Sequence, residues 1–404
     1  MSDNRVPVAA PRGDARPFLF TLVGIGAAST AAHLGNNFTA YLVGGLMDGF
    51  GFSPFAMGAW SMAETLSYAA AMFLIAPRAR QLDPRVLAVA ASVLVMLSQA
   101  GSALTGDYAL LFLGRIGTGL GFGILNAAVN LAAGRTGHPA RWISLGIAFQ
   151  TVLFAGIAIG LPQLGESYGA AGMFYGLAAA SLVLGLMTLA LPGGGDPAVG
   201  ETAASPNPPI DRDGQRVLAA MALFAFGTLA IWPFIERTAH AIGIPATEFG
   251  RYQSMATLAS ALGNTVLAAI TARLPRALPL AVVLGACGVT CALLTTVGTA
   301  PAFAAAFIGY YITWFLTYPM LLGLAYDCDP SGRLAVMTTG TWLLAQSLGS
   351  LAAGAIAQQF GGYRPIGPLG ALTCIVAIAV AWPLARQFDR TRPNDGTRAA
   401  AAGH

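Results

Sequence analysis

The stretch from Asp107 to Ala133 constrains the fold of this chain more than any other. It holds 27 residues, nearly all apolar, which is enough to cross a bilayer as a helix. One full charge, Arg115, lies inside it, and an arginine at that depth normally faces a protein interior or a wet cavity with a partner. Arg115, Asn126 and Asn130 fall within about 60° of one another on a helical wheel. The stretch therefore predicts a buried transmembrane helix whose polar stripe borders the path of a solute. A ladder of glycines on this helix allows close approach of a neighbour: Gly117, Gly119, Gly121 and Gly123.

Similar apolar runs fill most of the chain. Only 9% of the 404 residues are charged and 56% are hydrophobic, whereas about a quarter of a soluble protein is charged. The runs are roughly 20 to 28 residues long, far longer than a barrel strand, so the fold class is all-α integral membrane protein. The basic residues are all arginine and are scattered singly, and a net charge of +4 does not indicate a nucleic-acid partner. The expected surroundings are a lipid bilayer.

The pattern predicts twelve transmembrane helices in two groups of six. An amino-terminal tail (1–17) precedes the first bundle (18–191), and a carboxy-terminal tail (387–404) follows the second (216–386). Residues 192–215 are rich in Gly, Pro and Asp and predict a linker. The expected spans are 18–46, 54–77, 84–105, 107–133, 140–164, 170–191, 216–240, 247–273, 276–297, 300–326, 333–360 and 364–386.

The arginines predict the orientation. With both termini cytoplasmic, seventeen arginines lie on the inner side and three, Arg237, Arg251 and Arg364, on the outer side. We therefore expect both tails and the linker in the cytoplasm, with the chain in the inner (plasma) membrane of a bacterium.

The two halves repeat at a constant offset of 192 positions. Six spans per half is an even number, so both halves enter the membrane from the same side, as in a parallel repeat about an axis along the membrane normal. The matched pairs are Gly51 with Gly243, Gly58 with Gly250, Thr65 with Thr257, Gly117 with Gly309, Arg141 with Arg333 and Gly169 with Gly361.

With this repeat, the chain resembles the major facilitator superfamily of secondary transporters. The segment from Arg115 to Gly123, RIGTGLGFG, is similar to the family's Arg-x-x-x-Gly-x-Gly motif on span 4. The loop from Ala76 to Arg85 departs from the family's Gly-x-x-x-Asp-Arg-x-Gly-Arg signature. On span 5, Gly156 to Gly165 resembles the antiporter motif Gly-x-x-x-Gly-Pro-x-x-Gly, with Leu161 inserted. The resemblance implies that spans 1, 4, 7 and 10 line a central cavity.

Glu64, near the middle of span 2, is the first candidate for proton coupling. Hydrocarbon-depth surroundings favour a neutral carboxyl, and proton coupling needs a group that is neutral or charged near pH 7. His33 and Arg115 are expected to bias its charge, and His33 titrates near neutrality itself. The alternative is a static Glu64–Arg115 pair that locks the amino-terminal bundle.

Polar and aromatic side chains on the expected cavity helices and on the flanking spans 5 and 11 are the candidate substrate contacts. Helix packing is the alternative role for them, except that the alternative for Glu236 is a solvated helix end. Arg115 could instead bind a substrate anion through its planar fork. Pro233 is expected to kink span 7, and Glu236 and Arg237, being adjacent, are expected to point different ways and not to pair. The candidate substrate-binding residues are Asn36, Asn37, Arg115, Asn126, Gln150, Trp232, Glu236, Tyr310, Trp314, Tyr318, Trp342 and Gln346.

These features favour a transporter that moves a small organic solute, anionic or aromatic, by alternating access, driven by a proton gradient. One alternative is a drug or metabolite exporter that exchanges protons, and another is a membrane sensor that has lost transport. An enzyme is not expected, because no Ser-His-Asp or HExxH arrangement and no GxxxxGK[ST] loop occurs. The four cysteines show no disulfide or metal spacing, so neither a cofactor nor a metal is expected. The predicted oligomeric state is a monomer.

Overall fold

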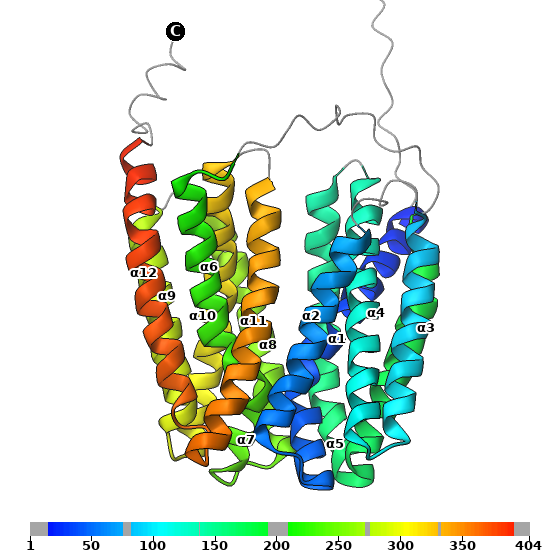
Figure 1. The fold of residues 1–404 in the computed structure, drawn as a ribbon. Helices are drawn as coiled ribbons and strands as arrows, with labels where there is room; N and C mark the ends of the chain where they lie inside the picture. The colour runs from blue at the N-terminus through cyan, green and yellow to red at the C-terminus, as the bar shows by residue number, and fades with distance from the viewer. Residues whose placement is uncertain are drawn as a thin grey trace, which may run out of the picture.

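The computed structural model describes residues 15–75, 82–136, 138–192, 209–270, 275–329 and 333–391, and within these ranges it contains helices and no strand. The amino-terminal half comprises α1 (Ala15–Phe50), α2 (Pro54–Ile75), α3 (Pro84–Ala103), α4 (Tyr108–Gly134) and α5 (Pro139–Met187), followed by a 3-10 turn, η2 (Thr188–Ala190). The carboxy-terminal half comprises α6 (Arg212–Ala230), the 3-10 turn η3 (Trp232–Phe234), α7 (Ile235–His240), α8 (Ala246–Ile270), α9 (Ala277–Thr296), α10 (Ala300–Cys328), α11 (Arg333–Phe360) and α12 (Ile366–Thr391). Figure 1 shows the halves as two bundles side by side. The prediction of an all-α fold is confirmed.

Eight helical segments of the described chain are long and apolar enough to cross a membrane. One of them, α5, bends back on itself at Gly169, whose φ of 63° and ψ of −158° are non-helical. Its two arms then pack together, because a Cβ on Gly176 would lie 2.5 Å from Leu164 Cδ1. Helices α2, α8 and α11 have 22, 25 and 28 residues and are not among these eight segments. The count of twelve spans stays a prediction.

The repeat is visible in the backbone. Four glycines have positive φ in the described chain: Gly51, Gly169, Gly243 and Gly361. They form two pairs separated by 192 positions. Gly51, Gly243 and Gly361 follow the ends of α1, α7 and α11, and Gly169 interrupts α5. Helices α2 and α8 begin 192 residues apart, and so do α4 and α10. The sequence prediction of two similar halves is confirmed by this shared geometry.

The two halves meet along two symmetric contacts. A Cβ on Gly58 of α2 would lie 2.6 Å from the carbonyl oxygen of Ser350 in α11. A Cβ on Gly250 of α8 would likewise collide with the carbonyl of Ala158 in α5. Subtracting 192 from 250 gives 58, and subtracting it from 350 gives 158, so the second contact is the first one repeated. Glycine at both positions lets the helix backbones touch.

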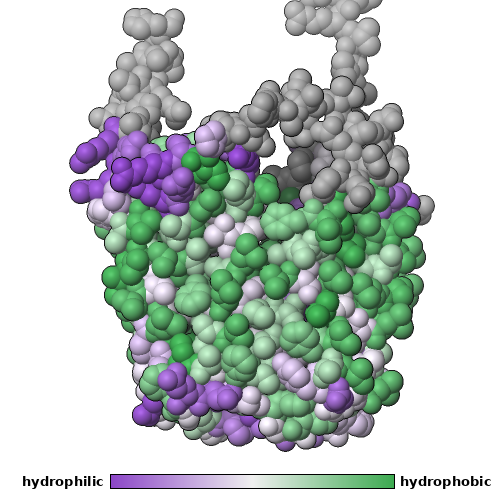
Figure 2. All heavy atoms as spheres, in the orientation of Figure 1, coloured by the Kyte–Doolittle hydropathy of each residue, from purple (hydrophilic) through white to green (hydrophobic). Residues whose placement is uncertain are grey.

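The surface agrees with a bilayer setting. Figure 2 shows a broad apolar band with hydrophilic residues at its two ends, and large apolar side chains such as Phe73, Leu262 and Val336 are exposed. The start of α1, the start of α6 and the end of α12 lie at the same end of the molecule (Figure 1), as an even number of spans per half requires. This end is called the linker end below, and the opposite end the far end. Most of the expected linker and of both tails, and most of the Ala76 to Arg85 loop, lie outside the described residues.

Candidate functional site

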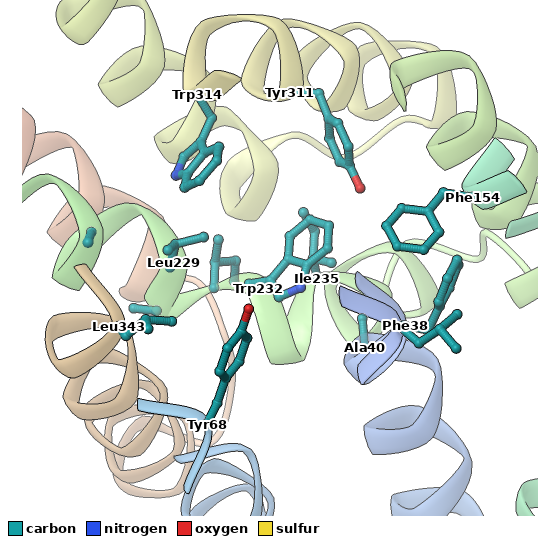
Figure 3. Packing of buried hydrophobic residues seen from close by; sticks show 14 of the residues in the cluster. Phe38, Ala40, Tyr68, Phe154, Leu229, Trp232, Ile235, Tyr311, Trp314 and Leu343 are labelled. Carbon is teal, nitrogen blue, oxygen red and sulfur yellow. The ribbon is translucent and has the colours of Figure 1, made fainter. Parts of the chain in front are cut away.

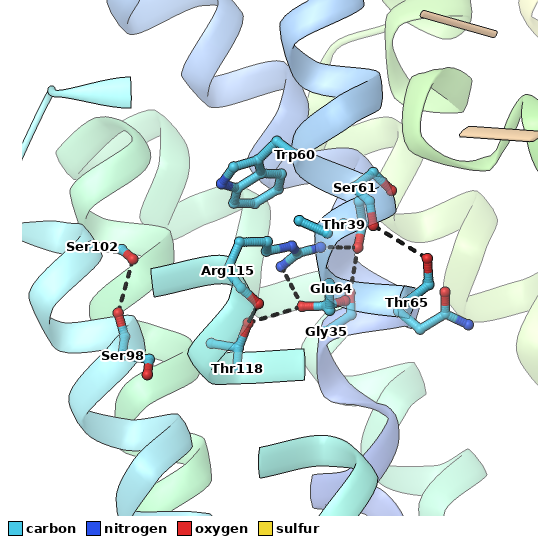
Figure 4. Close-up of polar contacts among 12 residues, drawn as sticks. Gly35, Thr39, Trp60, Ser61, Glu64, Thr65, Ser98, Ser102, Arg115 and Thr118 are labelled. Atoms are coloured by element: carbon cyan, nitrogen blue, oxygen red, sulfur yellow. Dashed lines mark hydrogen bonds and ion pairs between the residues drawn. The ribbon is translucent and has the colours of Figure 1, made fainter. Parts of the chain in front are cut away.

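A buried ion pair occupies the middle of the amino-terminal half (Figure 4). Arg115 Nη1 of α4 lies 2.7 Å from Glu64 Oε2 of α2, and both side chains are at most 2% exposed. Thr118 donates a hydrogen bond to the same carboxylate oxygen at 3.2 Å, and Arg115 donates to Thr39 of α1. The guanidinium carbon lies 3.8 Å from the ring centroid of Trp60, a cation–π contact. The pair therefore ties together α1, α2 and α4.

Small residues make room for this pair. A Cβ on Gly35 of α1 would lie 2.6 Å from Glu64 Oε1, and one on Gly119 would lie 2.9 Å from Ser67 Cβ. Gly119 belongs to the glycine ladder, so the ladder admits α2 and its carboxylate. The sequence correctly indicated that Arg115 has a buried partner, and its side chain is only 2% exposed.

The corresponding positions of the other half are apolar. A shift of 192 takes Glu64 to Ala256 and Arg115 to Phe307, and both of those side chains are 0% exposed. The same packing site is thus filled without charge in the carboxy-terminal half. The ion pair is a specific feature of one half and not a requirement of the fold.

A network of hydrogen bonds joins the halves on the far-end side of mid-depth. We call this network the roof, and its residues are Asn36, Asn37, Trp232, Gln253 and Gln346. Trp232 Nε1 donates to the Asn36 carbonyl oxygen at 2.5 Å, and Gln253 Nε2 donates to the Asn37 carbonyl oxygen at 3.1 Å. Gln346 Nε2 donates to Asn36 Oδ1 at 2.5 Å. Helix α1 runs from the linker end to the far end, and Asn36 and Asn37 lie in its second half. The roof therefore joins the two bundles on the far-end side of the middle of the molecule.

An ion cluster strengthens the closure at the far end. Arg237 makes two hydrogen bonds of 2.6 Å to the carboxylate of Asp48 at the end of α1. Its Nε also donates to Glu236 Oε2 at 2.8 Å. Gly44 of α1 leaves the space that the Glu236 carboxylate fills.

The expectation that Glu236 and Arg237 cannot pair is therefore wrong. Pro233 lies in η3, which separates α6 from α7, and both residues lie in α7. The rule for adjacent residues concerns the directions in which side chains leave the helix, and it does not account for a long side chain that bends back. The short α7 turns both side chains toward α1, and the long arginine side chain folds back onto its neighbour. The expected interruption at Pro233 is confirmed.

Polar side chains of the amino-terminal half lie between the roof and the linker end, and we call them the polar wall: His33, Tyr68, Asn126 and Gln150. His33 Nδ1 lies 2.9 Å from the Ser29 carbonyl oxygen, and Nε2 lies 3.5 Å from the Tyr68 hydroxyl. Since a carbonyl oxygen only accepts, Nδ1 carries the proton and donates. Gln150 Oε1 accepts a 2.8 Å bond from Ser29. His33, Asn126 and Gln150 remain partly exposed.

Aromatic side chains of the carboxy-terminal half lie at the same level, and we call them the aromatic wall: Phe224, Trp314, Tyr318 and Trp342. Trp314 is stacked on Tyr318 (centroids 6.0 Å apart, planes at 5°) and on Phe224 (5.7 Å, 26°). Trp342 lies 5.3 Å from Tyr318. The indole Nε1 atoms of Trp314 and Trp342 are buried and have no hydrogen-bond partner. Figure 3 shows Trp314 and Tyr311 opposite Tyr68, with Trp232 between them.

The structure separates the sequence candidates into distinct places. Asn36, Asn37, Trp232 and Gln346 belong to the roof, whereas Glu236 belongs to the far-end cluster. Asn126, Gln150, Trp314, Tyr318 and Trp342 belong to the two walls. Tyr310 instead turns into its own bundle, where its hydroxyl donates to the Thr228 carbonyl at 2.8 Å.

Sequence reasoning missed Tyr68 and Asp48. Tyr68 lies four residues after Glu64 on the same helix, so spacing alone could have placed both on one side of α2. Asp48 carried no signal beyond its place near the end of an apolar run. Among the described residues, no three His, Cys, Asp or Glu side chains come together as metal ligands would.

Comparison with known proteins identifies the fold. Residues 24–339 match the family model of the Major Facilitator Superfamily. No curated protein sequence matches the chain.

Three solved structures illustrate the similarity. A bacterial homologue of the human lysosomal transporter Spinster, in an inward-facing and unoccupied conformation, is 13% identical with a TM-score of 0.68, covering 96% of this chain and 100% of that one. The nucleoside transporter NupG is 13% identical with a TM-score of 0.70, covering 92% and 99%. A mutant of the peptide transporter POT is 12% identical with a TM-score of 0.71, covering 94% and 97%. At these identities the likeness concerns the fold. The family model matches about three quarters of the chain, and the structure has the paired bundles of this fold. The chain therefore belongs to the Major Facilitator Superfamily of membrane transporters.

Proposed function

We propose that the protein carries a small organic solute across the membrane by alternating access, coupled to protons. The observation that carries the proposal is that the roof and the ion cluster join the two bundles toward one end of the molecule, the far end. The roof and the Asp48–Arg237 contacts join the halves toward the far end. On the linker-end side of these contacts, five wall residues stay partly exposed: His33, Asn126, Gln150, Tyr318 and Trp342. An arrangement closed on one side and lined by binding groups is what a rocking two-bundle transporter needs.

The linker end is proposed to face the cytoplasm, as the excess of arginine on that side suggests. The conformation described is then open toward the cytoplasm. Among proteins of similar fold, one is named a nucleoside transporter, one a peptide transporter and one an organic anion transporter. Their diversity supports a small solute without selecting its chemistry.

Proton coupling is proposed at Glu64 and Arg115. A buried ion pair adds little net stability, because the cost of desolvating two charges offsets their attraction. Ala256 and Phe307 fill the equivalent site with apolar side chains, so packing alone does not explain the pair. We infer that it is retained because Glu64 must exchange a proton during the cycle.

The pair is well placed to influence the contact between the halves. Thr65 is the next residue of α2, and its Oγ1 lies 2.7 Å from Ser347 Oγ of α11. Protonation of Glu64 would remove the attraction that holds α2 to Arg115 of α4. Helix α2 would then be freer to shift against α11, the helix of the opposite half that it touches.

Proton movement in proteoliposomes with a trapped pH-sensitive dye tests both proposals. We expect solute-dependent proton flux with the wild type and its loss in Glu64→Gln, and the sign of the flux separates symport from exchange. Glu248→Gln is the matched control, since this carboxylate contacts only its own helix neighbour Tyr252 among the interactions described. Full pH-driven uptake by Glu64→Gln would place the coupling elsewhere, with His33 as the next candidate.

A further inference from the structure

The two walls of the centre are equivalent in position and opposite in chemistry. A shift of 192 takes Gln150 of the polar wall to Trp342 of the aromatic wall, and Asn126 to Tyr318. Each pair occupies the same place in its bundle, with an amide in one half and an aromatic ring in the other. A solute held between the bundles therefore meets hydrogen-bonding groups on one side and ring faces on the other.

The aromatic wall presents ring surface at the partly exposed Tyr318 and Trp342, together with unused donors. Trp314, Tyr318 and Trp342 lie within 6.1 Å of one another, centroid to centroid. Aromatic groups favour a planar partner in stacked or edge-to-face geometry. The Nε1–H groups of Trp314 and Trp342 are buried without an acceptor, which is costly for a polar group that nothing satisfies. A ligand with acceptor atoms on its edge would satisfy them.

The polar wall presents oriented groups that are already partly engaged. His33 uses Nδ1–H on Ser29, and its Nε2 accepts from the Tyr68 hydroxyl at 3.5 Å. The Tyr68 oxygen is then left as an acceptor. Gln150 uses its oxygen on Ser29, which leaves its amide nitrogen as a donor. This wall can therefore accept from and donate to the edge of the same ligand.

Neither wall offers a free charge. The two arginines that are buried in the described part of the chain are both paired, Arg115 with Glu64 and Thr39, and Arg237 with Asp48 and Glu236. The carboxylates of Glu64 and Glu236 are used in the same pairs. An ionised solute would enter this centre without a counter-ion, and burying an unpaired charge is far more costly than burying a neutral polar group.

Resting on the proposed transport function, we infer that the walls bind an uncharged, planar heteroaromatic solute that carries hydrogen-bond acceptors on its edge. The ring lies against Tyr318 and Trp342, and the acceptors take the two indole N–H groups. The opposite edge meets Tyr68 and Gln150. This assignment selects the aromatic alternative for the solute over the anionic one.

Binding to the purified full chain in lipid nanodiscs, measured by calorimetry, tests the inference. The probes are neutral rings (nicotinamide, uracil and adenine) and charged analogues of matched shape (nicotinate, orotate and 1-methylnicotinamide). We expect at least one neutral ring to bind, and its charged analogues to bind at least about tenfold more weakly. Trp314→Phe and Trp342→Phe keep a ring and remove one donor each, so each should weaken binding about tenfold, the scale of one buried hydrogen bond.

Trp382→Phe is the matched control, because Trp382 lies on α12 with Arg386 over its ring and outside both walls. It should bind the neutral ring like the wild type. The inference is overturned if charged analogues bind as well as neutral rings, if no neutral ring binds, or if both wall variants keep wild-type affinity. Solute-dependent proton flux is measured separately, so transport of a charged solute would refute this solute class while leaving the proposed function intact.

Discussion

Replacing Glu64 by leucine and Arg115 by methionine, singly and together, measures what the buried ion pair contributes to folding. Both residues are almost fully enclosed, with 1% and 2% exposure. The replacements are apolar and close in volume to the originals. The hydroxyls around them keep partners in every variant, since Thr39 donates to the Gly35 carbonyl at 2.6 Å and Thr118 to the Arg115 carbonyl at 2.9 Å.

The magnitudes follow from which charge is left alone. Removing one member of a buried pair costs about 3–5 kcal/mol of unfolding free energy. Glu64→Leu should lose about 4–5 kcal/mol of unfolding free energy, because the remaining guanidinium cannot lose its proton. Arg115→Met should lose about 3 kcal/mol, because a lone carboxyl can take up a proton and become neutral. Simple addition predicts a loss of about 7–8 kcal/mol for the double variant, but we expect its unfolding free energy to lie within about 1 kcal/mol of the wild type.

Equilibrium unfolding in mixed micelles, followed by tryptophan fluorescence, gives the four free energies of this cycle. The same four proteins are then assayed for proton-driven uptake. We expect the double variant to be folded and stable but inactive in coupled uptake, as a functional pair requires. A double variant as unstable as Glu64→Leu would refute the reasoning and assign the pair a structural role.

Two further predictions concern closure at the far end and the symmetric turns. Arg237→Met removes both hydrogen bonds to Asp48. Cysteine probes introduced at the far end should then react faster with a membrane-impermeant thiol reagent. An unchanged rate would mean that the roof alone keeps this end closed. Gly169→Ala and Gly361→Ala place a side chain at φ of 63° and 65°, so each should lose about 1–3 kcal/mol of unfolding free energy. Gly156→Ala is the control, because Gly156 lies at a helical position with open space around it. It should lose no stability in the same unfolding assay.

The sequence determined much of the architecture because the bilayer leaves few choices. Long apolar runs must be helices, since lipid cannot satisfy backbone hydrogen bonds. The offset of 192 positions predicted the repeat, and it reappears in the positive-φ turns at Gly51 and Gly243. An arginine inside a span predicted a buried partner, and Glu64 takes that place. These features depend on local composition and spacing, which a sequence records directly.

The tertiary structure decided which polar groups meet. No spacing rule links Asp48 to Arg237 across 189 positions, or Gln346 to Asn36 across 310. Helical periodicity predicts that Tyr310 lies on the same face of its helix as Trp314 and Tyr318. In the structure its hydroxyl donates to a carbonyl of α6, inside its own bundle. Contacts between distant segments depend on helix rotation and tilt, which many small packing terms set together. The sequence by itself therefore determined the fold and the inventory of polar groups, and only the packed bundles divided that inventory into an ion pair, a roof and two walls.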